Sequence, residues 1–160
     1  MAAPRHSAKI ATAADTLARI AQLPRPLVFT NGVFDVLHRG HVDYLERARA
    51  EGAALVVAVN SDASVRRLGK GDDRPLNSLD DRMAVLAALA AVDLVVPFDA
   101  DTPRDLIVAC SPDVLVKGGD YTAATTAGAA ETIAAGGRFA AIPFEFDRST
   151  TSLLRRIRGT

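Results

Sequence analysis

The sequence contains no tryptophan and one cysteine among its 160 residues, and aromatic residues make up 5% of it. So few aromatic rings argue against a stacking surface for single-stranded nucleic acid. The single cysteine, Cys110, excludes an intrachain disulfide and a cysteine-based metal cluster, which is typical of a reducing compartment. Because Cys110 follows the apolar residues 107–109, it is expected at a helix end packed in the core rather than as a nucleophile.

The sequence also lacks an excess of either charge and any long apolar run. Its 19 basic and 19 acidic residues cancel, so no overall positive field favours nucleic acid as a partner. No run of about 18 apolar residues occurs, so neither a transmembrane helix nor a membrane partner is expected. Residues 1–20 lack the sustained apolar stretch of a secretory signal. A cytoplasmic enzyme is therefore expected, and the near-zero net charge leaves room for a homodimer or higher homo-oligomer.

What is present is a regular alternation of short apolar runs and helical patterns. Unbroken apolar runs rich in β-branched residues predict strands that are buried on both faces of a parallel sheet. The alternation predicts a single-domain α/β fold, a Rossmann-like doubly wound sheet of about five parallel strands with ligands at their carboxyl ends. The predicted strands are 27–30, 55–59, 94–97, 114–116 and 139–143, and the predicted helices are 7–21, 41–50, 79–91, one from Pro103 after Thr102 as N-cap, 123–135 and 149–158.

The stretch from Thr30 to His41 joins the first predicted strand to the next helix, where such a fold binds ligands. Gly32 can take a positive φ, and Gly40 lets a phosphate approach the backbone closely. The helix that begins near Gly40 offers unpaired N–H groups and a positive dipole end to an anion. His38 and His41 are three residues apart, so both rings can point to the same side. These features predict a phosphate cradle whose imidazoles donate to oxygens that gain charge during transfer.

The two histidines allow other interpretations. Zinc would need further ligands, and the sequence offers one more histidine, His6, and no convenient cysteine. A Walker P-loop is absent. Two surface histidines in a turn would explain the spacing alone, but the place between a strand and a helix favours a ligand site.

The tetrapeptide His38-Arg39-Gly40-His41 resembles the His-x-Gly-His signature of the nucleotidyltransferase superfamily, which includes cytidylyltransferases, phosphopantetheine adenylyltransferase and class I tRNA synthetases. The whole stretch from Thr30 is similar to the cytidylyltransferase-like group. Within that group the chain most resembles adenylyltransferases that act on heptose 1-phosphate, over residues 27–158. The resemblance implies a nucleotidyltransferase domain at 25–160, preceded by an N-terminal helical extension at 1–24. Further segments that carry it are Asn60-Ser61-Asp62, Arg74-Pro75, Asp81-Arg82-Met83, Val116-Lys117-Gly118-Gly119-Asp120-Tyr121 and Ser149-Thr150-Thr151.

The resemblance also implies roles for individual residues. The implied catalytic set comprises His38 and His41 at the transferring phosphoryl group, Lys70 as a lid cation and Arg82 as a triphosphate ligand. Nucleotide contacts are implied for Thr30, Asn31, Gly32, Val33, Phe34, Gly40, Lys117, Gly119, Ser149, Thr150 and Thr151. Acceptor contacts are implied for Asp35, Asn60, Asp62, Gly118 and Asp120.

Several of these positions keep a second interpretation when they are judged from the residues alone. Segment 66–75 is either a solvated loop or a lid. Asp62 either caps the next helix or contacts a sugar, and Ser149-Thr150-Thr151 either caps the last helix or contacts phosphates. The superfamily's cation three residues after the last threonine is replaced here by leucine, and Arg155, one position later, is the nearest substitute.

The expected reaction joins ATP and D-glycero-β-D-manno-heptose 1-phosphate to give ADP-heptose and pyrophosphate, for lipopolysaccharide core or other heptose-containing glycan biosynthesis. Mg²⁺ is the expected cofactor, held mainly by nucleotide and water with help from Asp35, and no firm protein metal site is predicted. Two alternatives stay open. One is a cytidylyltransferase for a polyol phosphate such as glycerol 3-phosphate, and the other is a nucleotide-binding module without turnover.

Overall fold

The computed structural model describes residues 4–69, 71, 73–146 and 150–159, and within them five parallel strands form one sheet. The strand order is β3-β2-β1-β4-β5, so the chain reverses direction of winding between β1 and β4. This confirms the predicted Rossmann-like doubly wound α/β sheet. The strands are β1 (Leu27–Gly32), β2 (Ala54–Asn60), β3 (Leu94–Phe98), β4 (Val114–Gly118) and β5 (Arg138–Ile142).

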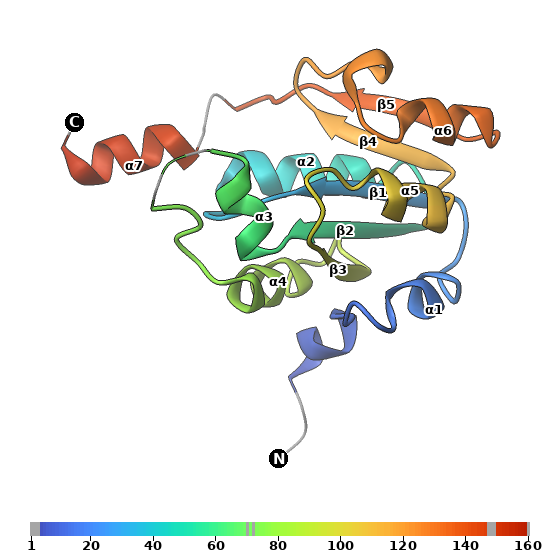
Figure 1. Ribbon diagram of the computed structural model, residues 1–160, viewed down its shortest axis with the longest axis horizontal. Helices are drawn as coiled ribbons and strands as arrows, with labels where there is room; N and C mark the ends of the chain where they lie inside the picture. Colours follow the sequence, from blue (N-terminus) through green and yellow to red (C-terminus); the bar gives the residue numbers. More distant parts are fainter. Residues whose placement is uncertain (1–3, 70, 72, 147–149, 160) are drawn as a thin grey trace.

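Helices cover both faces of this sheet (Figure 1). On one face, α2 (Arg39–Arg49) and α4 (Leu79–Ala87) share a core with apolar side chains such as Val57. On the other face, α1 (Thr16–Ile20), α5 (Arg104–Cys110) and α6 (Ala129–Ala134) share a second core with side chains such as Val56. Because every residue of β2 is buried, its unbroken apolar run fits a central strand covered on both sides.

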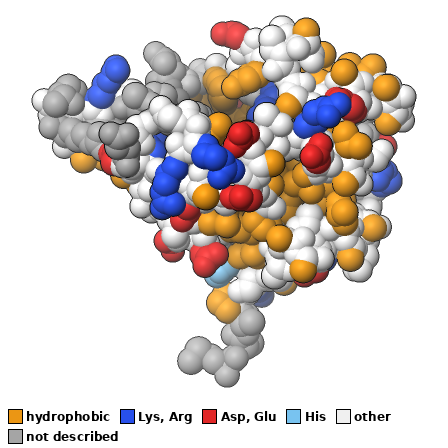
Figure 2. Space-filling model, in the orientation of Figure 1, with side chains coloured by type: hydrophobic (Ala, Val, Ile, Leu, Met, Phe, Trp, Pro, Cys, Tyr) orange, Lys and Arg blue, Asp and Glu red, His pale blue; other side chains and the backbone are white. Residues whose placement is uncertain are grey.

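The remaining elements connect or extend this frame. They are the helices α3 (Asp62–Arg67) and α7 (Thr150–Arg158) and the short 3-10 helices η1 (Arg5–Lys9) and η2 (Ala123–Thr125). No helix within the described ranges has the length and apolar character needed to cross a membrane. On the face in Figure 2, basic and acidic side chains lie interspersed, in agreement with the zero net charge.

The prediction of one helix over 7–21 is wrong. The segment forms η1 and α1, with an extended stretch between them that pairs with the outer edge of β3. Ile10 forms a β-bridge with Val95, and the N–H of Ala11 donates to the carbonyl of Val95 at 2.9 Å. Thr12 then starts a turn, because its N–H donates to Asp15 Oδ1 at 2.6 Å. The domain boundary at residue 25 stays a prediction.

Smaller differences concern helix ends. The predicted helix over 123–135 is split into η2 and α6, and Gly128 between them has a left-handed φ of 84°. Ser61, not Asp62, caps α3, because its Oγ accepts from the N–H of Ser64 at 3.0 Å. Pro103 itself occupies the N-cap position of α5 in place of Thr102. Cys110 lies buried at the end of α5, as predicted, and burial raises the pKa of its thiol to about 12.

Candidate active site

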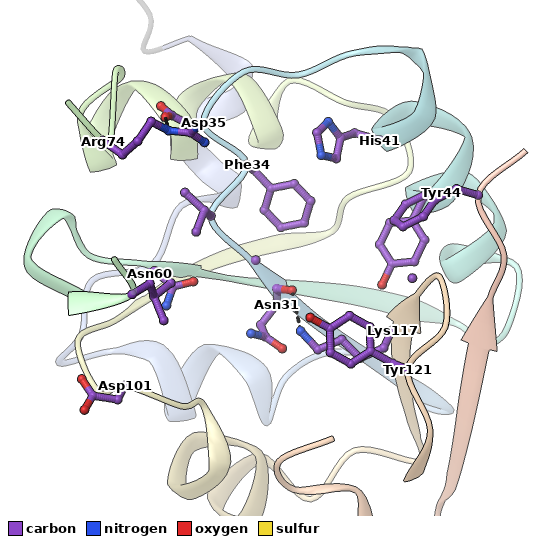
Figure 3. Close-up of a pocket in the computed structure, with 15 residues that line it drawn as sticks. Asn31, Phe34, Asp35, His41, Tyr44, Asn60, Arg74, Asp101, Lys117 and Tyr121 are labelled. Carbon is purple, nitrogen blue, oxygen red and sulfur yellow. Dashed lines mark hydrogen bonds and ion pairs between the residues drawn. The ribbon is translucent and has the colours of Figure 1, made fainter. Parts of the chain in front are cut away.

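A pocket of about 700 Å³ opens at the carboxyl ends of β1, β2 and β4 (Figure 3). This is the edge where the strand order reverses, and doubly wound sheets bind ligands there. Nine of the residues predicted for the site line the pocket, namely the run Asn31-Gly32-Val33-Phe34-Asp35, His41, Asn60, Lys117 and Gly118.

Of the other predicted residues, those whose side chains the structure describes lie outside the lining of the pocket. Thr30 is fully buried, and its Oγ1 hydrogen-bonds with the hydroxyl of Tyr44 at 2.6 Å. Gly119 and Asp120 follow β4 in the loop beyond the pocket wall. Thr150 and Thr151 form the first turn of α7. Lys70 and Ser149 lie outside the described residues.

The two histidines lie at the start of α2, where His38 is the N-cap and His41 the third helical residue. Their rings stack with centroids 3.9 Å apart, and His41 faces the pocket. The N–H of His38 donates to Nδ1 of His41 at 3.3 Å. A neutral His41 therefore carries its proton on Nε2 and can donate it to a ligand.

Burial keeps His41 neutral. Burial first, and the neighbouring His38 second, together lower the pKa of the imidazole from 6.5 to about 4. At neutral pH the ring is then a hydrogen-bond donor without net charge. Gly40 sits between the histidines, and a Cβ at this position would lie 3.1 Å from atoms of the His38 ring. Glycine at position 40 thus allows the two rings to stack.

The backbone at Phe34 has a φ of 50°, a left-handed conformation that residues other than glycine seldom adopt. Its ring lies edge-on to His41 with centroids 5.5 Å apart. A Cβ at Gly32 would lie 2.9 Å from the same ring, so glycine makes this path possible. The hydrogen bonds of the described residues leave the N–H of Phe34 without an acceptor. Such strained backbone with an unused donor is typical of functional loops.

Asp35 has a fully buried carboxylate that binds the segment before α4. It accepts from Arg74 Nε at 2.6 Å and from the N–H groups of Leu76 and Asn77, each at 2.9 Å. Both carboxylate oxygens are therefore occupied by the protein. Contact of Asp35 with the acceptor or with a metal therefore stays a prediction, and a ligand there would have to displace one of these donors.

Arg82 is also fully buried, although it was predicted as a triphosphate ligand. Its guanidinium donates to three backbone carbonyls, those of Asn77 at 3.0 Å, Val33 at 2.8 Å and Asn60 at 2.8 Å. It also pairs with Asp62 Oδ1 at 2.7 Å, so Asp62 faces an arginine rather than the pocket. The structure thus places Arg82 behind the pocket wall, and its contact with the triphosphate stays a prediction.

The β4 and β5 side of the pocket carries half-exposed aromatic rings. Lys117 Nζ donates to the carbonyl of Asn31 at 3.1 Å and lies 5.5 Å from the ring centroid of Tyr121. The ring of Phe144 lies against Gly118, where any Cβ would collide with it, and 5.7 Å from the ring of Tyr44. Asn31 Oδ1 is buried and accepts no hydrogen bond within the described part of the chain. A ligand can therefore find a ring surface, a cation and an unused acceptor on this side.

Six residues that line the pocket were not predicted as site residues. Tyr44 could have been found, because it follows His41 by three positions on the same helix face. Arg74 and Tyr121 lie in segments that carry the family resemblance. Leu68 lies in segment 66–75, which was predicted as a loop or lid. Asp101 and Phe144 had no signal in the sequence, because their positions depend on the path of the chain beyond β3 and β5.

The described residues offer no resident metal site. Nowhere in the described ranges do three or more histidine, cysteine or acidic side chains come together as possible metal ligands. The carboxylate of Asp35, three residues before His38, already accepts hydrogen bonds from the protein on both oxygens. The donor set of this pocket therefore does not fit a metal held by the protein alone.

Chemically, the pocket combines a neutral imidazole donor, an unused backbone N–H, a lysine and aromatic rings. No serine, threonine or cysteine is among the described residues that line it. It is suited to bind and polarise a phosphate chain with a ring attached.

Comparison with known proteins agrees with this reading. The cytidylyltransferase-like family matches residues 29–156. The chain is 58% identical over 160 residues to the D-beta-D-heptose 1-phosphate adenylyltransferase of Bordetella bronchiseptica, covering 99% of each chain. It is 60% identical over 131 residues to the bifunctional protein HldE of Shewanella denitrificans. This match covers 82% of this chain and 27% of HldE.

Solved structures show the same fold. The lipopolysaccharide core biosynthesis protein from Thermoplasma volcanium has a TM-score of 0.62 and 27% identity, covering 76% of this chain and 98% of that one. Pantoate-beta-alanine ligase from Francisella tularensis has a TM-score of 0.62 and 15% identity, and the match covers 89% of this chain and 68% of that one. At this identity the similarity shows a common fold only. With its family match over most of its length, the chain belongs to the cytidylyltransferase-like family.

Proposed function

We propose that this protein is an adenylyltransferase that joins ATP and D-glycero-β-D-manno-heptose 1-phosphate, giving ADP-heptose and pyrophosphate. The observation that carries the proposal is the 58% identity to a heptose 1-phosphate adenylyltransferase across nearly the whole of both chains. The pocket supports it, because its neutral donors and lysine suit a phosphate chain. The product would serve lipopolysaccharide core or other heptose-containing glycan biosynthesis.

The reaction needs no protein nucleophile, because the phosphate oxygen of the sugar is already anionic. That oxygen attacks the α-phosphorus of ATP in line, a new O–P bond forms, and the bond between the α-phosphorus and the bridging oxygen breaks as pyrophosphate leaves. Catalysis then consists of positioning and charge stabilisation. His41 Nε2–H and the N–H of Phe34 donate to oxygens of the transferring group, and His38 stacks behind His41 and fixes its tautomer.

The two substrates occupy different sides of the pocket. The adenine ring stacks on the aromatic side formed by Tyr121 and Phe144, where flat rings can be covered. The heptose lies on the other side, where Asn60 and Asp101 offer polar groups to its hydroxyls. This division places the reacting phosphorus between them, beside His41.

Charge on the leaving pyrophosphate is neutralised by cations that close around it. Lys117 lies in the pocket, and Lys70 is proposed as the lid cation that completes the set. Thr150 and Thr151, in the first turn of α7, are proposed to contact the phosphates together with Ser149, which precedes them in the sequence. Arg155 follows on the same helix. Gly40 leaves the start of α2 open to the same anion.

Mg²⁺ is proposed to arrive as the complex of ATP, because the described residues do not supply a ligand cage for it. When bound, it neutralises phosphate charge. Because ATP and sugar phosphates are cytoplasmic metabolites, the cytoplasm is the proposed compartment. A homodimer or higher homo-oligomer stays a prediction that sedimentation can test.

A pyrophosphate-release assay tests the proposed function. ATP and CTP are each paired with heptose 1-phosphate in both anomers, glycerol 3-phosphate and glucose 1-phosphate. Release with ATP and the β-anomer, with ADP-heptose identified by mass spectrometry, is expected. Release with CTP and glycerol 3-phosphate would support the cytidylyltransferase instead. Tight nucleotide binding with no release in any pair would show a binding module and overturn the proposal.

A further inference from the structure

We infer that Arg82 is a positioning residue, which holds the strained loop after β1 so that the N–H of Phe34 faces the phosphate in the pocket. This assigns Arg82 a task different from the triphosphate contact that the family resemblance implies. The inference rests on the proposed adenylyl transfer.

The first step concerns what Arg82 holds. Its side chain has no exposed surface, and every guanidinium nitrogen donates to an acceptor at 2.7–3.0 Å. Three of these acceptors are backbone carbonyls from three separate segments, the loop after β1, the end of β2 and the entry to α4. One side chain on α4 therefore ties together the loops that form one side of the pocket.

The second step concerns the peptide between Val33 and Phe34. It is a trans peptide, so its carbonyl and its N–H point in opposite directions. Arg82 Nη1 binds the Val33 carbonyl at 2.8 Å from behind the pocket wall, since Val33 and Phe34 line the pocket and Arg82 does not. The N–H of Phe34 must then point away from Arg82, toward the pocket.

The third step concerns strain. Phe34 sits at a φ of 50°, a conformation that is unfavourable for residues other than glycine and persists only where the surroundings impose it. The hydrogen bond from Arg82 to the preceding carbonyl is such a constraint. Without it, the Val33–Phe34 peptide can turn over, and the pocket then presents a carbonyl to the phosphate instead of a donor. A carbonyl in that place would repel the charge that develops on the transferring group.

Substitution of Arg82 should therefore lower turnover more than ATP affinity. We expect Arg82→Gln to lower kcat about a hundredfold, the loss typical of one missing oxyanion donor, while the KM for ATP changes by less than about threefold. Arg82→Lys keeps the charge but cannot reach all three carbonyls, so its kcat should be intermediate. Arg104 is an exposed arginine on α5 that pairs with Glu131, so Arg104→Gln is the matched control. Its kcat and its KM for ATP should equal those of the wild type. A KM for ATP that rises strongly with kcat unchanged would overturn the inference.

A measurement on the wild-type protein decides the matter if the variants fail to fold. In ¹⁵N-resolved NMR, saturation with a non-hydrolysable ATP analogue and Mg²⁺ should move the amide proton of Phe34 downfield and leave the Arg82 Nε–H signal in place. A shift of the Arg82 signal with no shift at Phe34 would show direct phosphate contact and overturn the inference. If the wild-type protein releases no pyrophosphate, the proposed function is contradicted. The NMR shifts would still show whether Phe34 or Arg82 faces the phosphates.

Discussion

The two sides of the pocket differ in how their residues are held. On the β1 and β2 side, which we call the anchored side, the side chains of Asp35 and Arg82 are fully buried and each binds three or more partners. On the β4 and β5 side, which we call the aromatic side, Tyr121 is 53% exposed and Phe144 52%. Charged side chains on the anchored side are therefore buried and held by the protein, whereas the rings on the aromatic side are exposed to solvent.

This difference matches the two tasks of the proposed reaction. Stabilising a transition state needs donors that are already in place, because reorganisation during the reaction reduces their benefit. Binding the ring of a nucleotide needs open apolar surface that the ligand itself covers. Damage to the anchored side should therefore lower turnover or stability, and damage to the aromatic side should lower affinity alone.

The largest effect is expected for His41→Ala on the anchored side. It removes the Nε2–H donor, and kcat should fall about a hundredfold or more while the fold stays intact. Steady-state pyrophosphate release with circular dichroism checks both parts. His6→Ala, in η1 away from the pocket, is the matched control. Unchanged turnover in a folded His41→Ala protein would remove His41 from the mechanism.

Asp35→Asn should mainly lower stability. The amide keeps the size of the carboxylate but leaves Arg74 buried without its counter-charge, and such losses cost about 3 kcal/mol. Urea unfolding gives the change in free energy. Asp43→Asn breaks an exposed pair with Arg47 on α2 and should cost less than about 0.5 kcal/mol. Equal effects of the two substitutions would show that the burial of Asp35 contributes nothing.

On the aromatic side, Tyr121→Ala should raise the KM for ATP about tenfold and leave kcat nearly unchanged, since one stacked base is worth about 1 to 3 kcal/mol. Tyr121→Phe keeps the ring and should behave like the wild type. Kinetics with each substrate varied in turn separate the two KM values. If the acceptor KM rises instead, the aromatic side holds the sugar and the substrate placement is reversed.

A further prediction concerns pH. The pKa of His41 is about 4 in the folded protein and 6.5 in the unfolded chain, so between these values the unfolded state binds more protons. The contribution of the neutral ring to stability is complete above pH 6.5 and is lost as the pH falls toward 4. Urea unfolding of the wild type and His41→Gln across this range should show their difference shrinking at low pH. A constant difference would contradict the lowered pKa.

The fold followed from the sequence because its strands are unbroken apolar runs, and five of them alternate with helices. The structure of the N-terminal segment could not be predicted in this way. Its composition over 7–21 favours a helix, but Ile10 pairs with the edge of β3 instead. That pairing is a tertiary contact, and no local pattern encodes it.

Part of the site could be predicted from the sequence. The histidines and the loop after β1 could be predicted, because a strand, a glycine-containing loop and a helix start are neighbours in the sequence. The settings of Asp35 and Arg82 could not, because their partners lie about 20 to 50 residues away in the chain. Residue type alone suggested ligands, and only burial showed that the protein itself uses these charges. Phe144 was missed for the same reason, since its place depends on the room left by Gly118.

A double-mutant cycle between His41→Ala and Tyr121→Ala tests the division of the pocket most directly. The two side chains lie apart in the pocket, and no hydrogen bond or ion pair joins them in Figure 3. If the anchored side acts on the phosphorus and the aromatic side on the nucleotide ring, their effects on kcat/KM for ATP should add to within about 0.5 kcal/mol. A coupling energy well above about 1 kcal/mol would show that both side chains serve the same step, and the division would be wrong.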